Sequence, residues 1–220
     1  MKIAVIEATT ISDAWFQCLF NIWCRGEKYV IERGSYEGET RLQYPYIVIK
    51  INNPYSEPYD SMLPQIPEAL GIPNPVANGY IEQYLPYIMT DHIEPGEDYS
   101  YGNRIYKQIS YWIDILKKTP NTNQAVLQVA QPNDYKLKDP PCLRQIKIKI
   151  IDNKLRFNID FRSWELWNAF SANLAAIAVL QKYMADEVGV ECGPLTASSD
   201  GLHLYGYAEE IAKLRVGITQ

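Results

Sequence analysis

The sequence has few of the residues that build metal centres, disulfide frameworks or membrane spans. It contains two histidines and four cysteines, and no two cysteines form a CxxC pair. A zinc site would therefore have few ligands, and the cysteines are too sparse for a disulfide framework. No apolar run approaches the roughly 20 residues that cross a bilayer. We expect no metal and no membrane span, and the short, soon acidic N-terminal stretch predicts a cytoplasmic protein.

The sequence also lacks a basic run. Its net charge is −5 at pH 7, which argues against a nucleic-acid-binding face but leaves room for a local anion pocket. Hydrophobic residues make up 47% and charged residues 21%, so the chain can form a substantial core. A length of 220 residues suits a single domain, and we find no repeats or linkers that would divide residues 1–220.

Residue periodicity predicts several elements in the first half of the chain. A helix is expected over 12–25, with Ser12 as its N-cap and Gly26 as its stop, and another over 79–89, broken by Pro86. Residues 28–43 are too polar for core and read as a loop, and residues 52–78 read as an irregular surface segment. Strands are expected at 1–8, 44–51 and 124–130, and a helix within 99–120, where apolar residues recur at helical spacing and Pro120 closes the segment.

The clearest element is a hairpin between residues 146 and 161. Apolar and polar residues alternate on both sides of a turn at Asp152-Asn153. A long, largely apolar helix is expected over 165–188, ending at Gly189, and residues 202–214 read as strand or turn running into helix. The whole pattern predicts an α+β fold in which a mixed β-sheet is layered with helices.

One cysteine stands out by its surroundings. Cys142 follows Pro140 and Pro141, and it directly precedes the hairpin, which ends at Arg162. A free thiol with a pKa of ~8.5 is only slightly ionised at neutral pH, so a nucleophilic cysteine needs a nearby cation. Arg162 is the candidate for that cation. The alternative is a buried cysteine beside an ordinary strand arginine.

Five short motifs follow one another between residues 101 and 207. By these motifs the C-terminal half resembles thymidylate synthase, and the short, Tyr-rich N-terminal half is similar to the compact archaeal branch of that family. The motifs are Tyr101-Gly102 with Arg104, Pro141-Cys142, Arg162-Ser163, Asn173, and His203 to Tyr205.

The resemblance implies a reaction and its co-substrate. The family methylates carbon 5 of uracil in deoxyuridylate and uses a methylene-carrying reduced pterin. Here that pterin is methylenetetrahydrofolate or methylenetetrahydromethanopterin. By resemblance Cys142 is the thiolate that adds to carbon 6, and Arg162 and Ser163 bind the 5′-phosphate.

Further roles also follow from the resemblance. Asn173 pairs with N3–H and O4 of uracil, where cytosine-modifying relatives place an aspartate. His203 and Tyr205 hold the deoxyribose 3′-hydroxyl, and Tyr101 helps to handle the C5 proton. Each residue has a structural alternative: Asn173 satisfies backbone groups, His203 stabilises the core, and Tyr101 is one of 17 tyrosines that pack a surface.

The sequence departs from the family at the pterin site and after the cysteine. Glu165 replaces an aspartate that hydrogen-bonds the pterin, and about two helical turns separate it from Asn173, so both can face one pocket. Leu143 stands where a histidine commonly follows the cysteine. Our choice for the general base is Glu82, in the predicted helix over 79–89.

The phosphate site also departs from the family. Asn123-Gln124 replace an arginine pair that reaches the phosphate of a partner subunit, and each lost charge-assisted contact contributes ~1.5–3 kcal/mol. We expect compensation from other arginines, or the absence of the usual dimer. A homodimer is the family default, and a monomer is the alternative. The candidate arginines are Arg33, Arg41, Arg104 and Arg144.

Two other functions stay open. A pyrimidine-nucleotide hydroxymethylase would use the same thiolate but end the reaction with water instead of hydride. A nucleotide-binding protein with little catalysis would bind the phosphate without exchange at carbon 5. The presence of Cys142, Arg162 and Asn173 together argues against the latter.

Overall fold

The computed structural model describes residues 3–34 and 36–218, and a mixed six-stranded sheet forms its centre. The strand order is β1-β4-β9-β7-β6-β5. β1 runs parallel to β4 and β7 parallel to β9, whereas the other neighbours are antiparallel. The bounds are β1 (Ile3–Ala8), β4 (Tyr46–Ile51), β5 (Val126–Gln128), β6 (Leu143–Ile151), β7 (Lys154–Phe161) and β9 (Glu191–Ser199).

The predicted hairpin is formed by β6 and β7. Its turn residues Asp152 and Asn153 have φ angles of 54° and 58°, a left-handed conformation that Asp and Asn tolerate better than most residues. The register pairs Leu143 with Phe161 at the far end of the hairpin. The residues that flank this end, Cys142 and Arg162, are therefore brought side by side, as the sequence predicts.

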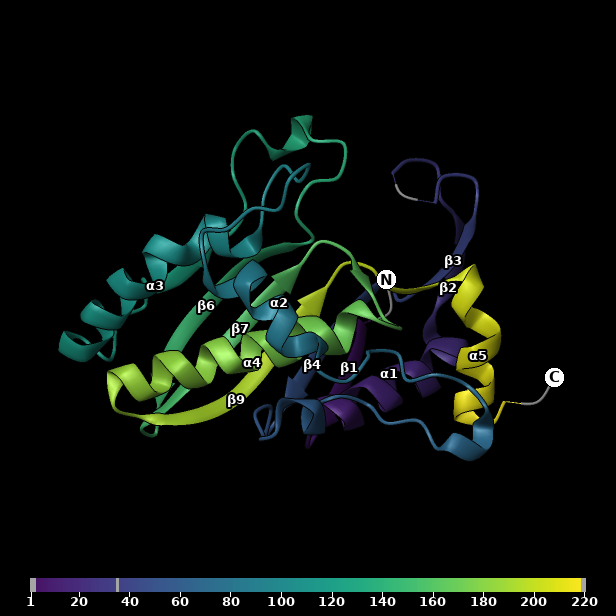
Figure 1. Cartoon of the computed structure of the whole chain (residues 1–220), viewed down its shortest axis with the longest axis horizontal. Helices are drawn as coiled ribbons and strands as arrows, with labels where there is room; N and C mark the ends of the chain where they lie inside the picture. Colours follow the sequence, from purple (N-terminus) through teal and green to yellow (C-terminus); the bar gives the residue numbers. More distant parts are fainter. Residues whose placement is uncertain (1–2, 35, 219–220) are drawn as a thin grey trace.

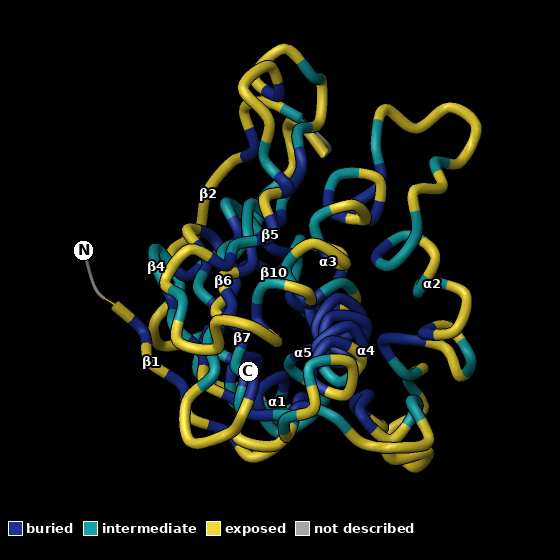
Figure 2. The backbone as a smooth tube through the Cα atoms, turned by 90° about the vertical axis from the view of Figure 1, so that its left-hand side faces the viewer, coloured by how far each residue is buried: buried dark blue, intermediate teal, exposed yellow. Residues whose placement is uncertain are grey.

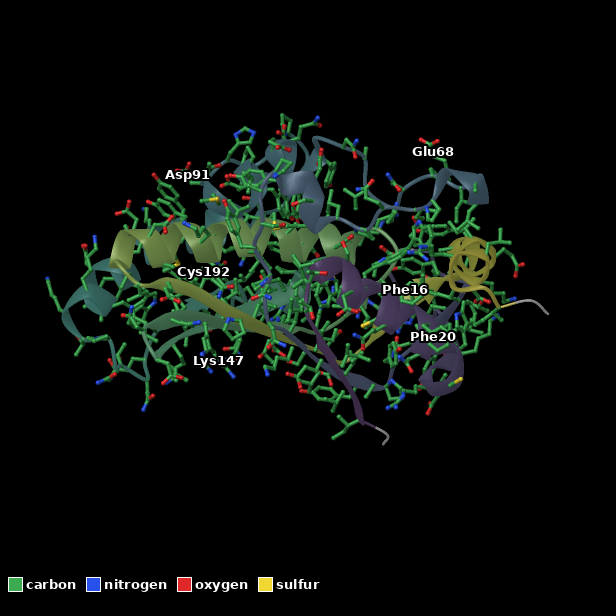
Figure 3. All side chains as sticks on the ribbon, turned by 90° about the horizontal axis from the view of Figure 1, so that it is seen from below. Phe16, Phe20, Glu68, Asp91, Lys147 and Cys192 are labelled. Carbon is green, nitrogen blue, oxygen red and sulfur yellow. The ribbon has the colours of Figure 1, made fainter. Side chains whose placement is uncertain are left out.

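Of the five α-helices in the described residues, α1, α3 and α4 pack on this sheet, α2 packs on α3 and α4, and α5 packs on α1, β3 and β10. Buried α4 lies across β7 and β9, and α2 and α3 pack against it (Figure 1). Figure 2 shows α4 as a dark blue coil among the other elements, and in Figure 3 Lys147 of β6 lies on the side of the sheet away from α4. The bounds are α1 (Ile11–Arg25), α2 (Tyr80–Met89), α3 (Tyr101–Lys118), α4 (Ala169–Val188) and α5 (Gly206–Val216).

A second sheet of four strands stands beside the first. Its order is β2-β3-β10-β8, and β10 pairs antiparallel with β3 and parallel with β8. Buried side chains from both sheets and the helices form one continuous cluster. The expected α+β class with a mixed sheet layered by helices is confirmed. The bounds are β2 (Glu27–Val30), β3 (Thr40–Gln43), β8 (Trp164–Glu165) and β10 (Leu202–Tyr205).

Gly102 allows α3 to approach the end of α2 closely. A Cβ atom at this position would lie 2.1 Å from the carbonyl oxygen of Thr90. Any larger residue would push the start of α3 away from α2. The glycine therefore sets the position of its neighbour Tyr101, which is buried.

Some predicted boundaries are wrong in the N-terminal half. α1 begins at Ile11 with Thr10 as its N-cap, because the Thr10 side chain accepts a hydrogen bond from the Asp13 amide at 3.2 Å. Ser12 lies inside the helix and donates to the carbonyl of Met62. The stretch 28–43, expected to be a loop, instead contributes most of β2 and all of β3, because pairing with each other and with β10 satisfies their backbone groups despite polar side chains.

Two helices also differ from expectation. α2 continues through Pro86, because Ile81, Tyr84 and Ile88 pack toward the interior and outweigh the ~3 kcal/mol that an interior proline costs. α4 begins at residue 169 and not at residue 165, since Trp164–Glu165 pairs with β10 as β8. β9 corresponds to no element predicted from the sequence.

The other expected elements are present with shifted ends. Of the strand expected at 1–8, residues 1 and 2 lie outside the described residues, and β1 covers the rest. Gly26 and Gly189 end α1 and α4 as expected. Within residues 3–34 and 36–218, no helix is both long and apolar enough to cross a membrane.

Candidate active site

A cavity of about 540 Å³ opens where the two sheets meet. The loop between β2 and β3 and the loop between β5 and β6 extend from the same end of the molecule and flank it (Figure 1). The structure brings every predicted site residue except Glu82 to this cavity. These lining residues are Arg33, Tyr101, Cys142, Arg162, Ser163, Glu165, Asn173, His203 and Tyr205.

Cys142 stands at the entrance to β6, next to Arg162. The Arg162 amide donates to the Cys142 carbonyl at 2.9 Å, which continues the hairpin ladder by one step. The Arg162 guanidinium donates to the carbonyls of Pro140 and Pro141 and to the carboxylate of Asp139, the latter at 3.3 Å. The two prolines thus present acceptors that hold the arginine beside the cysteine.

The thiol of Cys142 is not ionised by this cation. Burial raises the pKa of Cys142, and this effect outweighs the lowering by Arg162, while the Asp139 carboxylate raises the pKa further. Arg162 lowers the pKa of Cys142, in the direction expected of a neighbouring cation, but in the protein without ligands burial has the larger effect. Nucleophilic attack needs either removal of the proton during the reaction or a change in this environment.

Asn173 projects from the first turns of α4, and both ends of its amide are engaged. Its Oδ1 accepts from the indole Nε1–H of Trp164 at 3.0 Å, and its Nδ2 donates to the hydroxyl of Tyr84 at 2.8 Å. One N–H and one lone pair of the amide remain. The side chain can therefore still offer one donor and one acceptor to a ligand in the cavity.

His203 lies on β10 with one ring nitrogen bound to the backbone. Its Nδ1 is 2.8 Å from the Gly201 carbonyl, which can only accept, so Nδ1 carries the proton. Burial lowers the pKa of His203 to about 4, so the ring is neutral at pH 7. Its Nε2 is buried and has no hydrogen-bond partner among the described residues, which leaves an acceptor for a hydroxyl of a ligand.

Tyr205 extends the same strand. Its ring packs against His203 at 4.6 Å and against Tyr36 at 4.5 Å between centroids, so the loop between β2 and β3 contacts β10 here. Burial raises the pKa of Tyr205, which keeps its hydroxyl protonated at neutral pH. Both residues line the cavity.

Glu165 caps the start of α4. Its carboxylate accepts from the amides of Trp167, Asn168 and Ala169 at 2.6 to 2.9 Å. Burial raises the pKa of Glu165 even though these amides lower it. The premise that Glu165 and Asn173 lie on one helix is wrong, but both line the cavity because β8 leads directly into α4.

The candidate arginines divide into two groups. Arg33 and Arg41 line the cavity together with Arg162. Arg104 and Arg144 instead contact the buried Asp134, at 3.1 and 3.7 Å, and these ion pairs anchor the loop that leads to the cysteine. We find that Arg41 has a buried Nε without a protein partner in the described part of the chain.

Three expected features lie elsewhere. Glu82 is an exposed residue of α2 outside the cavity lining, because the helix turns Tyr84 toward Asn173 instead. Asn123 and Gln124 lie between α3 and β5, and Asn123 accepts a hydrogen bond from Lys149 near the turn of the hairpin. This turn is at the opposite end of β6 from Cys142.

Sequence reasoning missed Tyr84, Trp164 and Asp139. Tyr84 belongs to a row of rings in which Tyr80, Tyr84 and Tyr87 stack at 5.7 and 5.4 Å, and their spacing along α2 was a signal for one aromatic face. Burial raises the pKa of Tyr84 well above the usual range. No pattern in the sequence indicates that Trp164 contacts Asn173.

A second hollow adjoins the first on the side of this tyrosine row. It has a volume of about 500 Å³ and shares Asn173 and Ala169 with the main cavity. Its walls are mostly apolar and aromatic, which suits a flat heterocyclic ligand. The walls include Pro75, Val76, Ala77, Tyr80, Tyr84 and Ala172.

Comparisons with known proteins agree with this geometry. Residues 79–218 match the family model described as thymidylate synthase. A protein of Methanosarcina mazei named "Putative thymidylate synthase" is 30% identical over 210 residues, which cover 92% of this chain and 90% of that protein.

Two further matches are more distant. Thermostable thymidylate synthase A from Bacillus subtilis has a similar structure with a TM-score of 0.74 and 16% identity, over 96% of this chain and 86% of that one. The deoxyuridylate hydroxymethyltransferase of Bacillus phage SP01 is 34% identical over 114 residues, which cover 47% of this chain and 29% of that protein.

Proposed function

The chain belongs to the thymidylate synthase family, and we propose that it methylates carbon 5 of the uracil ring in deoxyuridylate. The observation that carries this proposal is the presence of Cys142, Arg162, Asn173 and His203 in one cavity. Together they offer a nucleophile, a phosphate ligand, a base-reading amide and an acceptor for a sugar hydroxyl. We treat residues 1–220 as one domain, since the buried side chains form one cluster.

The nucleotide is held at three points in this proposal. Arg162 and Ser163 bind the 5′-phosphate with Arg33 and Arg41, all of which line the cavity within one chain. This set replaces the arginine pair that Asn123-Gln124 lack, so phosphate binding does not require a partner subunit. A homodimer remains our expectation from the family.

In the same proposal, His203 and Tyr205 bind the sugar, and Asn173 binds the base. The free Nε2 of neutral His203 accepts from the 3′-hydroxyl, and Tyr205 adds its own hydroxyl. The remaining N–H and lone pair of Asn173 pair with O4 and N3–H of uracil. This arrangement turns carbon 6 toward Cys142.

Cys142 starts the reaction by adding to carbon 6. The sulfur forms a bond to carbon 6, and the electrons of the C5–C6 double bond move to O4, which makes carbon 5 nucleophilic. Bound phosphate competes with the carbonyls of Pro140 and Pro141 for the Arg162 guanidinium, and the thiol proton passes to solvent as the bond between sulfur and carbon 6 forms. Burial raises the pKa of Tyr101, so this residue acts as a neutral hydrogen-bonding group when the C5 proton leaves.

The family uses a folate-type one-carbon donor, and the second hollow fits a reduced pterin. Its aromatic and apolar walls adjoin Asn173, next to the place proposed for the base. Glu165 has one acceptor site left after its three amide contacts, which can receive a pterin N–H. When bound, the methylene pterin supplies the one-carbon unit and the hydride.

A second candidate is hydroxymethylation of the same nucleotide. The partial match to the phage deoxyuridylate hydroxymethyltransferase, 34% identical over 114 residues, favours it, because hydroxymethylation can start with the same thiolate addition to carbon 6. The two reactions differ in whether hydride or water completes the product.

Product analysis tests the proposal. Deoxyuridylate is incubated with the protein and with methylenetetrahydrofolate or methylenetetrahydromethanopterin, and the product is identified by mass spectrometry. We expect thymidylate with one of the two donors. A hydroxymethylated product would favour the second candidate, and an unchanged nucleotide with both donors would contradict the proposal.

A further inference from the structure

The base-reading amide of Asn173 is ambiguous by itself. Uracil offers an acceptor at O4 and a donor at N3, whereas cytosine offers a donor at N4 and an acceptor at N3. An amide has a donor on one side and an acceptor on the other, so turning it by half a rotation converts a partner for uracil into a partner for cytosine. The selectivity of the site therefore depends on what fixes the orientation of this amide.

Trp164 provides a fixed reference for that orientation. The indole Nε1–H lies 3.0 Å from Oδ1 of Asn173, and an indole can only donate. Placing the Nδ2 group of the amide there would set two donors against each other in a buried place. Asn173 is 9% exposed and Trp164 is 2% exposed, so water cannot easily relieve that conflict.

The indole itself is held by two aromatic rings from different elements. Phe161, at the end of β7, stacks on it with centroids 4.0 Å apart and an interplanar angle of 7°. Phe170, in the first turn of α4, packs on it at 4.6 Å. The direction of the indole N–H is thus set by the packing of β7 against α4.

Tyr84 contacts the other side of the amide but does not choose its orientation. Its hydroxyl accepts from Nδ2 at 2.8 Å. A hydroxyl can also donate, so it would satisfy Oδ1 equally well if the amide were turned. Of the two partners, the indole alone distinguishes the two orientations.

We propose that Trp164 is a specificity-determining positioning residue, whose indole N–H fixes the Asn173 amide in the orientation that accepts uracil and rejects cytosine. This inference rests on the proposed function, because it takes Asn173 as the residue that contacts the base. Trp164 acts through Asn173 and need not touch the nucleotide. Without the indole donor, the amide can adopt both orientations, with the Tyr84 hydroxyl as partner in each.

The test compares the binding of dUMP and dCMP to purified protein by titration calorimetry, without a pterin. The variants are Trp164→Phe, which keeps an aromatic ring between Phe161 and Phe170, and Tyr84→Phe. We expect Trp164→Phe to reduce the ratio of dUMP to dCMP affinity by about tenfold or more. In the wild type, turning the amide would leave the buried indole N–H facing the Nδ2 group without an acceptor, and the variant removes this cost. Tyr84→Phe should weaken the binding of both nucleotides and leave the ratio of their affinities unchanged.

Tyr111→Phe serves as the control for a Tyr→Phe substitution, since Tyr111 is exposed on α3 and lines neither hollow. It should keep both affinities. A Trp164→Phe protein that binds dUMP with the wild-type preference over dCMP would overturn the inference. A wild-type protein that does not prefer dUMP would instead contradict the proposed function.

A measurement on the wild-type protein covers the case in which Trp164→Phe does not fold. The indole proton of Trp164 is assigned by NMR, and its exchange with solvent is followed. A buried proton bonded to Asn173 should exchange at least about tenfold more slowly than a free indole. Exchange at the rate of a free indole would overturn the proposed role of the hydrogen bond between Trp164 and Asn173.

Discussion

Protonation of His203 gives the sharpest quantitative prediction. The ring is buried, and its Nδ1 is 2.8 Å from the Gly201 carbonyl. The pKa of His203 is lowered to about 4: burial is the main cause, the hydrogen bond to the Gly201 carbonyl opposes it, and the positive charge of Arg41 adds a smaller lowering. The folded protein therefore resists a proton that the unfolded chain binds readily near pH 6.5.

The sign and size of the effect follow from linkage. Because the pKa of His203 is depressed in the folded state, its contribution to stability is present above pH 6.5 and is lost as the pH falls toward 4. Between about pH 7.5 and about pH 5, this one group should lower the free energy of unfolding by about 2 kcal/mol. Other titrating groups add their own terms, so a comparison with a variant is needed.

The assay is urea unfolding followed by tryptophan fluorescence at both pH values. His203→Gln removes the titrating ring, so its loss of stability between these pH values should be about 2 kcal/mol smaller than that of the wild type. Equal pH dependence in His203→Gln and the wild type would refute the reasoning.

Three further changes test the surroundings of the cavity. Asp139→Asn should lower the pKa of Cys142, measured by the pH dependence of its alkylation, because it removes a negative charge that raises this pKa. Because Arg41 is proposed to contact the phosphate, Arg41→Met should weaken the binding of dUMP about tenfold or more and leave the binding of deoxyuridine nearly unchanged. Asp134→Ala should reduce the free energy of unfolding by about 3–5 kcal/mol, because it leaves the buried Arg104 unpaired.

Each of these changes has a result that would count against it. An alkylation profile of Cys142 that moves to higher pH in Asp139→Asn would show that the carboxylate acts in another way. Arg144→Met is the control for Arg41→Met, since Arg144 contacts Asp134 outside the cavity lining, and equal losses of dUMP binding in both would exclude a specific phosphate contact. Wild-type stability of Asp134→Ala would mean that the ion pairs do not anchor the loop.

The parts of the site that sequence reasoning found are those set by local rules. Strict alternation and the Asp152-Asn153 turn define the hairpin register, and that register brings Cys142 and Arg162 together. Asn173 and His203 were instead identified through the family resemblance, and both line the cavity. The hairpin depends on a short stretch of chain whose geometry is nearly independent of the rest.

The parts that were missed depend on packing between distant elements. Which face of α2 turns inward is decided by its contacts with α4, so Tyr84 reaches Asn173 while Glu82 points to solvent. The strand that carries Glu165 forms because β10 lies beside it, and this strand shortens α4 at its start. Burial, which the sequence does not show, also reverses the expected pKa shift of Cys142.

Release of tritium from carbon 5 of labelled deoxyuridylate tests the central claim most directly. Addition of Cys142 to carbon 6 is the step that makes carbon 5 exchange its hydrogen, so release reports the attack itself. We predict release from deoxyuridylate in the presence of a reduced pterin, no release from deoxycytidylate, and loss of release in Cys142→Ala. Release that persists in Cys142→Ala, or nucleotide binding without any release by the wild type, would contradict the account.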